Sequence, residues 1–210
     1  MMPVNISKLA EHFVYKSKYI DIAQDMLREF IRFHRVQLSS DLRQALDIVK
    51  SYLHDFSIES KIYHISSSTI REFFNAFGWE LEDARLELLG PDISTSFTSD
   101  DTKLLAVVHS PSGISSGEIT LMKKDQDLSG KIVLITEDHR VNYLKAIEKG
   151  ASGAIFARKT ADTSAYPYFG LFISKDLLET KGIPAVTIPW SYAERIIKAI
   201  KRGEKISAII

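Results

Sequence analysis

Apolar residues recur every three or four positions in the first quarter of the chain, which is the spacing of an amphipathic helix. This pattern predicts helices over about 15–33 and 41–56, and Ser40 or Asp41 is the expected N-cap of the second helix. Apolar residues are more closely spaced in 57–65, which favours a strand. Two helices and one strand are too little for an independent core, so this part must pack on something else.

From Lys103 onward the chain consists of short apolar runs separated by polar turns, which predicts strands alternating with helices. The expected strands lie at 104–109, 118–122, 131–135, 153–157, 183–189 and 205–210. Helices are expected at about 141–149 and 191–203, with a long connection at about 158–182. An earlier strand is expected within 79–89. The order of these elements predicts an α/β (α+β) fold.

Several residues stand where the backbone needs a turn or a close approach. Gly150 lies where a C-terminal glycine cap belongs, because glycine adopts positive φ without strain. Gly153 allows the backbone after this helix to approach its neighbours closely. Gly130 and Pro184 are the other expected structural positions, each at the start of an apolar run.

Composition narrows the range of partners. The chain has 27 Lys and Arg against 27 Asp and Glu, which argues against nucleic acid and gives no reason to expect an anionic membrane. There is no cysteine, so disulfides, thiolate metal sites and cysteine nucleophiles are excluded. Lys8, Glu11 and His12 stand where a signal peptide needs an apolar stretch, and no apolar run approaches the ~18 residues of a membrane span. A cytoplasmic location is the expectation.

The motifs that most resemble catalytic sites have simpler structural interpretations. None of the six histidines has a partner four residues away and no HExxH motif is present, so no metal site is predicted. The GASGA segment around Ser152 runs from helix to strand, whereas a nucleophile elbow runs from strand to helix. Asp138 and His139 follow a strand, where ligands bind in open α/β sheets, but we favour Asp138 as a helix N-cap.

The serine- and glycine-rich loop at 109–118 lacks the Gly-Lys-Ser/Thr of a phosphate-binding loop. It is predicted to be a flexible hairpin connection. No catalytic residue is therefore predicted anywhere in the chain.

The long connection contains the best candidate for an interaction surface. Large apolar side chains gather there outside any regular element, and exposed aromatic patches often mark contact sites. These side chains are Tyr166, Tyr168, Phe169, Leu171 and Phe172. The alternative interpretation is that the segment folds back to cover one end of the sheet.

Residues 103–210 resemble a protease-associated domain, a non-catalytic module attached to larger peptidases. The resemblance is carried, in order, by DLSGKIVLI (127–135), LKAIEKGASGAIFA (144–157) and KGIPAVTIPWSYAERIIKAI (181–200). It implies a swivelling β/β/α-type domain with a mixed, barrel-like sheet.

The earlier part, with its two helices and the segment FGWELEDARLELLGP, is similar to the start of zinc aminopeptidases of the aminopeptidase Y and transferrin-receptor type. In that family the protease-associated domain is inserted after the first helices and strand of the peptidase domain, and the zinc-binding half follows it. The resemblance implies that 1–65 is the start of a peptidase domain, 66–102 a connecting segment and 103–210 the inserted module. The zinc-binding half has no counterpart in this sequence, so no cofactor is expected here and zinc only in a missing catalytic domain.

The function implied is a non-catalytic accessory or interaction module of a zinc-aminopeptidase-like protein, which helps to position substrates or partners. The partner would be a peptide or protein, such as a downstream peptidase domain. The parent protein would be a zinc-dependent aminopeptidase. The alternative is a free-standing interaction or dimerisation module, in which the apolar stripes of the N-terminal helices form a homodimer interface.

Overall fold

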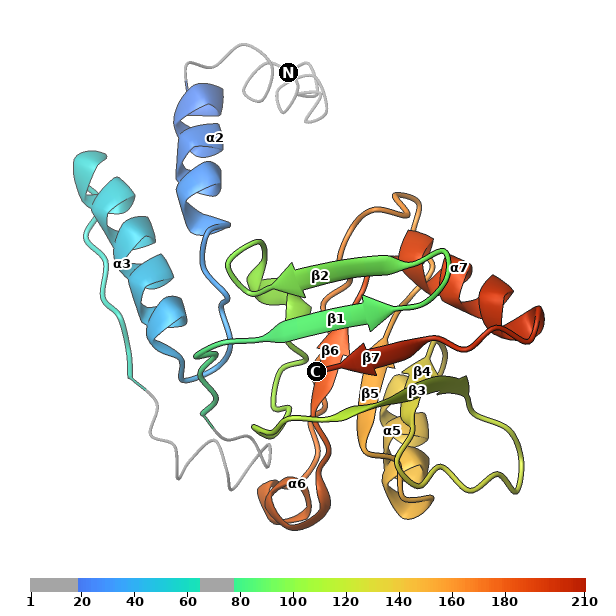
Figure 1. Ribbon diagram of the computed structural model, residues 1–210. Helices are drawn as coiled ribbons and strands as arrows, with labels where there is room; N and C mark the ends of the chain where they lie inside the picture. Colours follow the sequence, from blue (N-terminus) through green and yellow to red (C-terminus); the bar gives the residue numbers. More distant parts are fainter. Residues whose placement is uncertain (1–18, 65–77) are drawn as a thin grey trace, which may run out of the picture. The chain divides into compact units, whose positions relative to one another are not determined.

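The computed structural model describes residues 19–64 and 78–210 (Figure 1). The chain divides into two compact units, Met1–Ile65 and Ser66–Ile210. Each unit is described by itself below.

The described part of the first unit is a pair of helices. Helix α2 spans Tyr19–Phe30 and helix α3 spans Ser40–Asp55, close to the predicted ranges; positions 15–18 of the first prediction lie outside the described residues. The hydroxyl of Tyr52 on α3 donates a hydrogen bond to Oε1 of Glu29 on α2, at 3.0 Å. Ala45 is fully buried, which lets the two helices approach closely.

The N-cap of α3 is Ser39, so the prediction of Ser40 or Asp41 is wrong. Ser39 has the extended backbone that a cap requires, and its Oγ accepts a hydrogen bond from the N–H of Leu42 at 3.1 Å. The carboxylate of Asp41 instead accepts from the backbone N–H of His34, at 2.8 Å. Asp41 therefore fixes the connection before α3.

The strand predicted over 57–65 is absent from its described part, 57–64. Ile58 is 51% exposed and Tyr63 is 77% exposed, so the apolar residues of this segment have no buried face. An extended segment without a neighbouring strand gains no ladder of hydrogen bonds, and the local pattern alone does not make it a strand.

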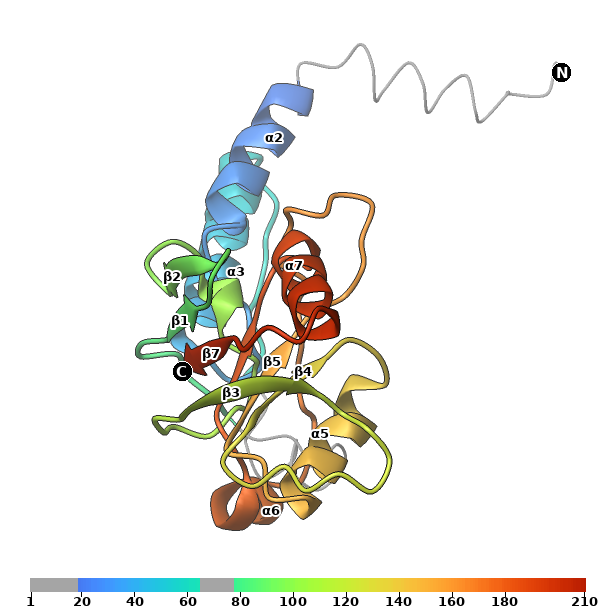
Figure 2. The ribbon, with the colours of Figure 1, turned by 45° about the vertical axis from the view of Figure 1, so that its right-hand side comes forward.

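The second unit contains a seven-stranded sheet within residues 78–210, in the order β2-β1-β7-β3-β4-β5-β6. The strands are β1 (Arg85–Leu89), β2 (Ser94–Thr98), β3 (Ser116–Leu121), β4 (Ile132–Ile135), β5 (Gly153–Phe156), β6 (Ala185–Thr187) and β7 (Ser207–Ile209). Strands β2, β1, β7 and β3 pair antiparallel, and β3 to β6 pair parallel. The sheet is therefore mixed, and it curls into an open half-barrel (Figure 2).

Helices cover both faces of the parallel part of this sheet (Figure 2). Helices α5 (His139–Glu148) and α6 (Lys175–Lys181) contribute to one core cluster, and α7 (Trp190–Lys201) contributes to the other. Alternate residues of β4 and β5 enter the two clusters, as the two-residue period of a strand requires. The predicted α/β class with a mixed, barrel-like sheet is confirmed.

The backbone of the turn between α5 and β5 requires glycine at two positions. The N–H of Ala151 bonds to the carbonyl of Ala146 and that of Gly150 to Ile147, both at 3.0 Å, which is the Schellman pattern of a helix end. Gly150 has φ +79°, where a side chain is strained. A Cβ on Gly153 would lie 3.0 Å from Oγ of Ser115, so the backbones are in close approach there.

The apolar run 104–109 is not a strand. A 3₁₀ turn occupies Lys103–Leu105, and the chain then makes only isolated bridges, Ala106 to Val186 and Val108 to Gly170. The loop predicted as a hairpin, 109–118, consequently joins no paired strands. The run is apolar because it is buried. A fully buried coil and a buried strand have the same sequence signature, so the pattern alone could not tell them apart.

Strand β2 and helix α6 were not predicted. Strand β2 has the polar sequence STSFT with Phe97 as its buried residue, so it has almost no apolar alternation. Helix α6 has only seven residues and lies inside the long connection.

Asp138 is the N-cap residue of α5, but its side chain makes no capping hydrogen bond, so that part of the prediction is wrong. Its φ of +42° differs from the extended backbone from which a side chain reaches back to the helix. The backbone carbonyl of Asp138 accepts from the N–H of Asn142 at 2.9 Å. In the described part of the chain, no helix combines the length and apolar character needed to cross a membrane.

Candidate binding cleft

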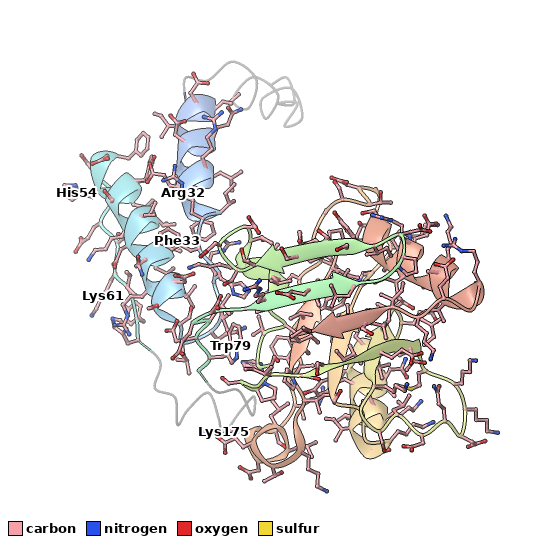
Figure 3. The ribbon with its side chains drawn as sticks, viewed as in Figure 1. Arg32, Phe33, His54, Lys61, Trp79 and Lys175 are labelled. Atoms are coloured by element: carbon pink, nitrogen blue, oxygen red, sulfur yellow. The ribbon has the colours of Figure 1, made fainter. Side chains whose placement is uncertain are left out.

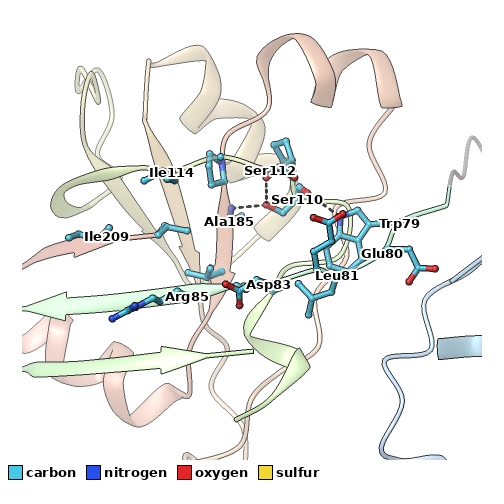
Figure 4. A pocket seen from close by; sticks show the side chains of 18 of the residues that line it. Trp79, Glu80, Leu81, Asp83, Arg85, Ser110, Ser112, Ile114, Ala185 and Ile209 are labelled. Atoms are coloured by element: carbon cyan, nitrogen blue, oxygen red, sulfur yellow. Dashed lines mark hydrogen bonds between the residues drawn. The ribbon is translucent and has the colours of Figure 1, made fainter. Parts of the chain in front are cut away.

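A cleft of about 540 Å³ opens on the second unit (Figure 4). We call residues 79–85, which lead into and begin β1, its first wall. Residues 110–114, which lead toward β3, are its second wall. The start of β6 and the end of β7 complete the lining.

The first wall is held at both of its ends. Ala84 is tied toward β2, since its carbonyl accepts from the N–H of Ser99 at 2.8 Å and its N–H donates to Oγ of Ser99 at 3.0 Å. At the other end, Nε1 of Trp79 donates to the carbonyl of Ser110 at 3.1 Å (Figure 4); Trp79 is also labelled in Figure 3. Trp79 therefore joins the first wall to the second.

The second wall is also anchored. The Oγ of Ser110 accepts a hydrogen bond from the N–H of Ala185 in β6, at 2.8 Å. At the other end, Ser115 and Ile210 exchange two backbone hydrogen bonds, of 3.0 and 2.8 Å. A Cβ on Gly113 would lie 3.0 Å from Cγ of Pro184, so the middle of this wall rests against the start of β6.

Many of the lining residues, in the walls and between them, are apolar. These are Trp79, Leu81, Ala84, Ala106, Pro111, Ile114, Pro184, Ala185, Val186, Ile209 and Ile210. Ile114 is 91% exposed and Ile209 is 37% exposed. These two side chains therefore add exposed apolar surface to the cleft.

The charges around the cleft are mostly negative. Glu80, Glu82, Asp83 and Glu87 line it, and Arg85 is the cation among the lining residues. Arg85 pairs with Glu87 at 2.6 Å, and Oδ1 of Asp83 accepts from the hydroxyl of Ser99 at 2.9 Å. The net negative potential favours a ligand that carries lysine or arginine.

The ionisable side chains among the described lining residues are four carboxylates and one guanidinium. The lining residues that the structure describes include no histidine, lysine or cysteine, and the hydroxyl of Ser110 is engaged by Ala185. Across residues 19–64 and 78–210, no three His, Cys, Asp or Glu side chains gather where they could hold a metal ion.

The residues of the long connection that the sequence singled out are separated by the fold. Phe169 and Leu171 are buried, at 6% and 1% exposure, and belong to the core cluster under α5 and α6. Tyr166 is half-buried with its ring 6.4 Å from that of Phe97. Tyr168 and Phe172 remain about half exposed, at 47% and 50%. Of these five side chains, two therefore belong to the core, one is half-buried and two are partly exposed.

His139 packs closely against its neighbours at the carboxyl ends of the parallel strands. The Nε2 of His139 lies 2.9 Å from the carbonyl oxygen of Ala157, and its ring is 4.1 Å from that of Phe169. The guanidinium of Arg158 stacks over the same phenyl ring at 4.7 Å. Burial, together with the charge of Arg158, lowers the pKa of His139 against the opposing effects of Ala157 and Asp138.

Three further positions that the sequence singled out lie in turns or beside strands. The hydroxyl of Ser152 donates to the carbonyl of Lys131 at 3.0 Å, where it supports the turn into β5. Gly130 has φ +68° in the turn before β4. Pro184 lines the cleft and its carbonyl accepts from Ala154 at 2.9 Å.

The cleft was not predicted from the sequence. Two signals were available: the acidic run Glu80–Asp83 before β1, and the isolated Ile114 in a serine- and glycine-rich loop. Neither signal has a spacing that identifies a site. Only the pairing of strands that are distant in sequence brings the two segments to opposite sides of one cleft.

No family model matches this sequence, and no curated protein matches it. The fold, however, is one found in peptidases. The M28 peptidase precursor from Shewanella amazonensis SB2B matches with a TM-score of 0.55 and 17% identity, over 97% of this chain and 48% of that chain. An aminopeptidase from Aneurinibacillus sp. strain AM-1 matches with a TM-score of 0.44 and 17% identity, over 95% of this chain and 45% of that chain. This chain spans about half the length of both.

Proposed function

We propose that this chain is the non-catalytic accessory part of a zinc-aminopeptidase-like protein, and that its cleft binds a peptide or protein segment. In this proposal residues 103–210 are a protease-associated domain. The observation that carries the proposal is the cleft itself, in which apolar side chains lie beside four carboxylates and whose described lining residues include no histidine, lysine or cysteine. The peptidase fold supports the aminopeptidase context.

We propose no zinc site among the described residues. They contain no group of three His, Cys, Asp or Glu side chains that could hold a metal ion. In this proposal we assign these residues no zinc ligand and no step of peptide hydrolysis. A peptidase domain is one of the proposed partners.

The test measures hydrolysis and binding on the same purified chain. Leucine p-nitroanilide is offered with and without added ZnCl₂, and an immobilised sample is exposed to a mixed pool of hexapeptides. We expect no hydrolysis above the buffer rate and retention of intact peptides rich in lysine, arginine and aliphatic residues. Hydrolysis that rises with bound zinc would contradict the proposal, and so would a chain that retains no peptide.

A variant pair makes the binding result specific. Glu82→Lys reverses a charge in the cleft lining and is expected to reduce retention, whereas Glu148→Lys reverses an exposed charge on α5, outside that lining. Equal loss of retention in the two variants would show that the total charge of the protein, and not the cleft, attracts the peptides.

A second candidate is a dimerisation module, which the N-terminal helices favour. Leu27 is 55% exposed and Ile31 is 61% exposed, although both belong to the apolar stripe of α2 and its end. A second copy of the stripe would cover such residues. Sedimentation that shows a dimer in the wild type and a monomer in Leu27→Asp supports this candidate; a monomeric wild type at high concentration contradicts it.

A further inference from the structure

Strand β2 forms one edge of the sheet (Figure 1). It pairs with β1 in continuous register over the whole of Ser94–Thr98, without a bulge. In the described part of the chain, no strand pairs with its other side. An open edge of this kind carries main-chain donors and acceptors that another strand can use.

The hydrogen bonds around β2 show which of its residues face the open side. Ser99, just after the strand, donates its N–H to the carbonyl of Ala84 on the side of β1, at 2.8 Å. The direction of the main-chain groups alternates along an antiparallel pair, so the odd-numbered residues of β2 also face β1. The main-chain groups of its even-numbered residues, Ser94, Ser96 and Thr98, therefore face outward.

The chain itself satisfies the outward groups of Thr98. Its N–H donates to Oδ2 of Asp101 at 3.3 Å, and its carbonyl accepts from the N–H of Asp101 at 3.2 Å. The outward N–H and C=O groups of Ser94 and Ser96 form no hydrogen bond with any described residue. Both serines are exposed, so two donors and two acceptors are left for water or for a partner.

The sequence of β2 lacks several features that usually keep an edge strand from pairing. These features are charged side chains, proline and bulges. The strand reads STSFT, in which Phe97 is buried on the inner face and the other side chains are small and uncharged. No charge in β2 therefore opposes a second strand. Its five residues limit the number of new hydrogen bonds, which predicts a weak pairing.

A second copy of β2 matches the open groups one for one. When two copies run antiparallel about a two-fold axis at Thr95, Ser94 of each copy lies opposite Ser96 of the other. Each of these two pairs exchanges two hydrogen bonds, which uses every open donor and acceptor on both copies. The two Thr95 side chains then form a non-hydrogen-bonded pair, in which threonines interact favourably.

The charges at the two ends of β2 favour the same arrangement. Arg195 lies at the start of the strand, where its Nη2 donates to the carbonyl of Asp92 at 2.5 Å, and Asp100 follows the end of the strand. Neither Arg195 nor Asp100 forms an ion pair with a described residue, whereas the carboxylate of Asp92 is paired with Arg202. The antiparallel arrangement places the start of one strand beside the end of the other, so Arg195 of each copy approaches Asp100 of its partner.

We propose that this chain self-associates through β2, which pairs antiparallel with β2 of a second copy and joins the two sheets into one. The contact is isologous: Ser94 binds Ser96 of the other copy, and Arg195 meets Asp100 at both ends. A contact of this size forms a weak dimer. The inference goes beyond the proposed function, because it involves neither the cleft nor the apolar stripe of α2.

Sedimentation velocity of the purified chain tests the dimer from about 10 µM to about 1 mM, a range suited to weak interfaces. We expect a monomer at the lowest concentration and a dimer fraction that rises with concentration. A monomer over the whole range would overturn the proposal. Ser96→Pro removes one outward N–H but no hydrogen bond to β1, and should weaken association about tenfold or more.

Three control variants make this result specific. Ser96→Ala keeps the outward N–H and should still dimerise, and so should Leu27→Asp on α2. Loss of the dimer in Leu27→Asp, with retention in Ser96→Pro, would assign association to the helices and overturn the proposal. Arg195→Asp alone should weaken association about threefold or more, and Asp100→Arg added to it should restore association. A double variant as weak as the single one would overturn the antiparallel arrangement.

Amide hydrogen exchange, followed by NMR, tests the strand pairing itself. From the dilute to the concentrated sample, exchange at Ser94 and Ser96 should slow about threefold or more. The amides of Thr95 and Phe97 should not change, because they bond to β1 in both states. A dimer without added protection at the two serines would overturn the proposal. Full protection of both serines in the dilute monomer would also overturn it, because the protein's own chain would then cover the edge.

Discussion

The Oγ of Ser110 accepts a hydrogen bond from the backbone N–H of Ala185 at 2.8 Å, between residues 75 positions apart in sequence. The carbonyl of the same serine accepts from Nε1 of Trp79. Ser110 therefore holds the second wall of the cleft to strand β6 and to the first wall. A loop rich in serine and glycine gains a fixed shape in this way, and a fixed shape is what a binding surface needs in order to limit the entropy lost on binding.

Replacement of Ser110 tests this role. Ser110→Ala leaves the N–H of Ala185 without its acceptor, and we expect the free energy of unfolding to fall by about 1–2 kcal/mol. The exposed Ser112→Ala, two residues along, should change it by less than about 0.5 kcal/mol. Urea unfolding followed by tryptophan fluorescence measures both. Equal effects of the two variants would mean that the Ser110 hydrogen bond does not stabilise the loop.

Gly150 offers a test of the turn between α5 and β5. Gly150→Ala places a side chain at φ +79°, where its Cβ would also lie 3.0 Å from Oγ of Ser129. The backbone cost alone is about 1 kcal/mol, and the contact adds to it. Gly130→Ala is the matched control, because Gly130 has φ +68° with no atom within 4 Å of the added Cβ. Thermal denaturation should rank Gly150→Ala as the less stable; the reverse order would contradict this account of the turn.

Tyr143 connects α5 to the start of β6. Its hydroxyl donates to the carbonyl of Ile183 at 2.8 Å and accepts from the N–H of the same residue at 3.0 Å. Burial raises the pKa of Tyr143 to about 12, so the hydroxyl stays protonated over the ordinary pH range. Tyr143→Phe leaves two backbone groups unpaired and should cost about 1–3 kcal/mol in chemical denaturation. The exposed Tyr63→Phe should cost almost nothing; a similarly small effect at Tyr143 would show that water replaces its hydroxyl.

His139 should make stability depend on pH. Burial, and then the charge of Arg158, lowers its pKa in the folded state below the ordinary value of 6.5. The unfolded chain therefore binds a proton more readily, so stability is highest above pH 6.5 and declines as the pH falls from there toward the folded-state pKa. Urea unfolding at pH 7.5 and 5.0 measures the decline, and His139→Gln, whose amide can still donate to Ala157, should make it smaller. An unchanged decline in the variant would assign the effect to other groups.

The sequence predicted the elements whose local signal and tertiary role agree. Strands β4 and β5 are continuous apolar runs buried on both faces, and the turn around Gly150 has the residues that its backbone requires. Helix α7 was predicted for the same reason, because Ala193, Ile196 and Ala199 recur at helical spacing and are all buried.

The errors arose where tertiary contacts outweigh the local pattern. Strand β2 has little apolar character and exists because it pairs with β1 along its whole length. The run after Lys103 is buried but makes only isolated bridges. The cleft depends on the convergence of 79–85, 110–114 and β6, which are joined by contacts between residues as far apart as Ser110 and Ala185. No local spacing encodes such a convergence.

The most direct test of the central claim is an NMR titration of the ¹⁵N-labelled chain with the hexapeptide acetyl-Lys-Val-Lys-Val-Lys-Val-amide. Binding in the cleft predicts amide shift changes concentrated at 79–87, 110, 112–114 and 185–186, with the peptide recovered intact by mass spectrometry. Shift changes centred instead on Tyr168 and Phe172, or an absence of changes at millimolar peptide, would contradict the claim that the cleft is the binding site.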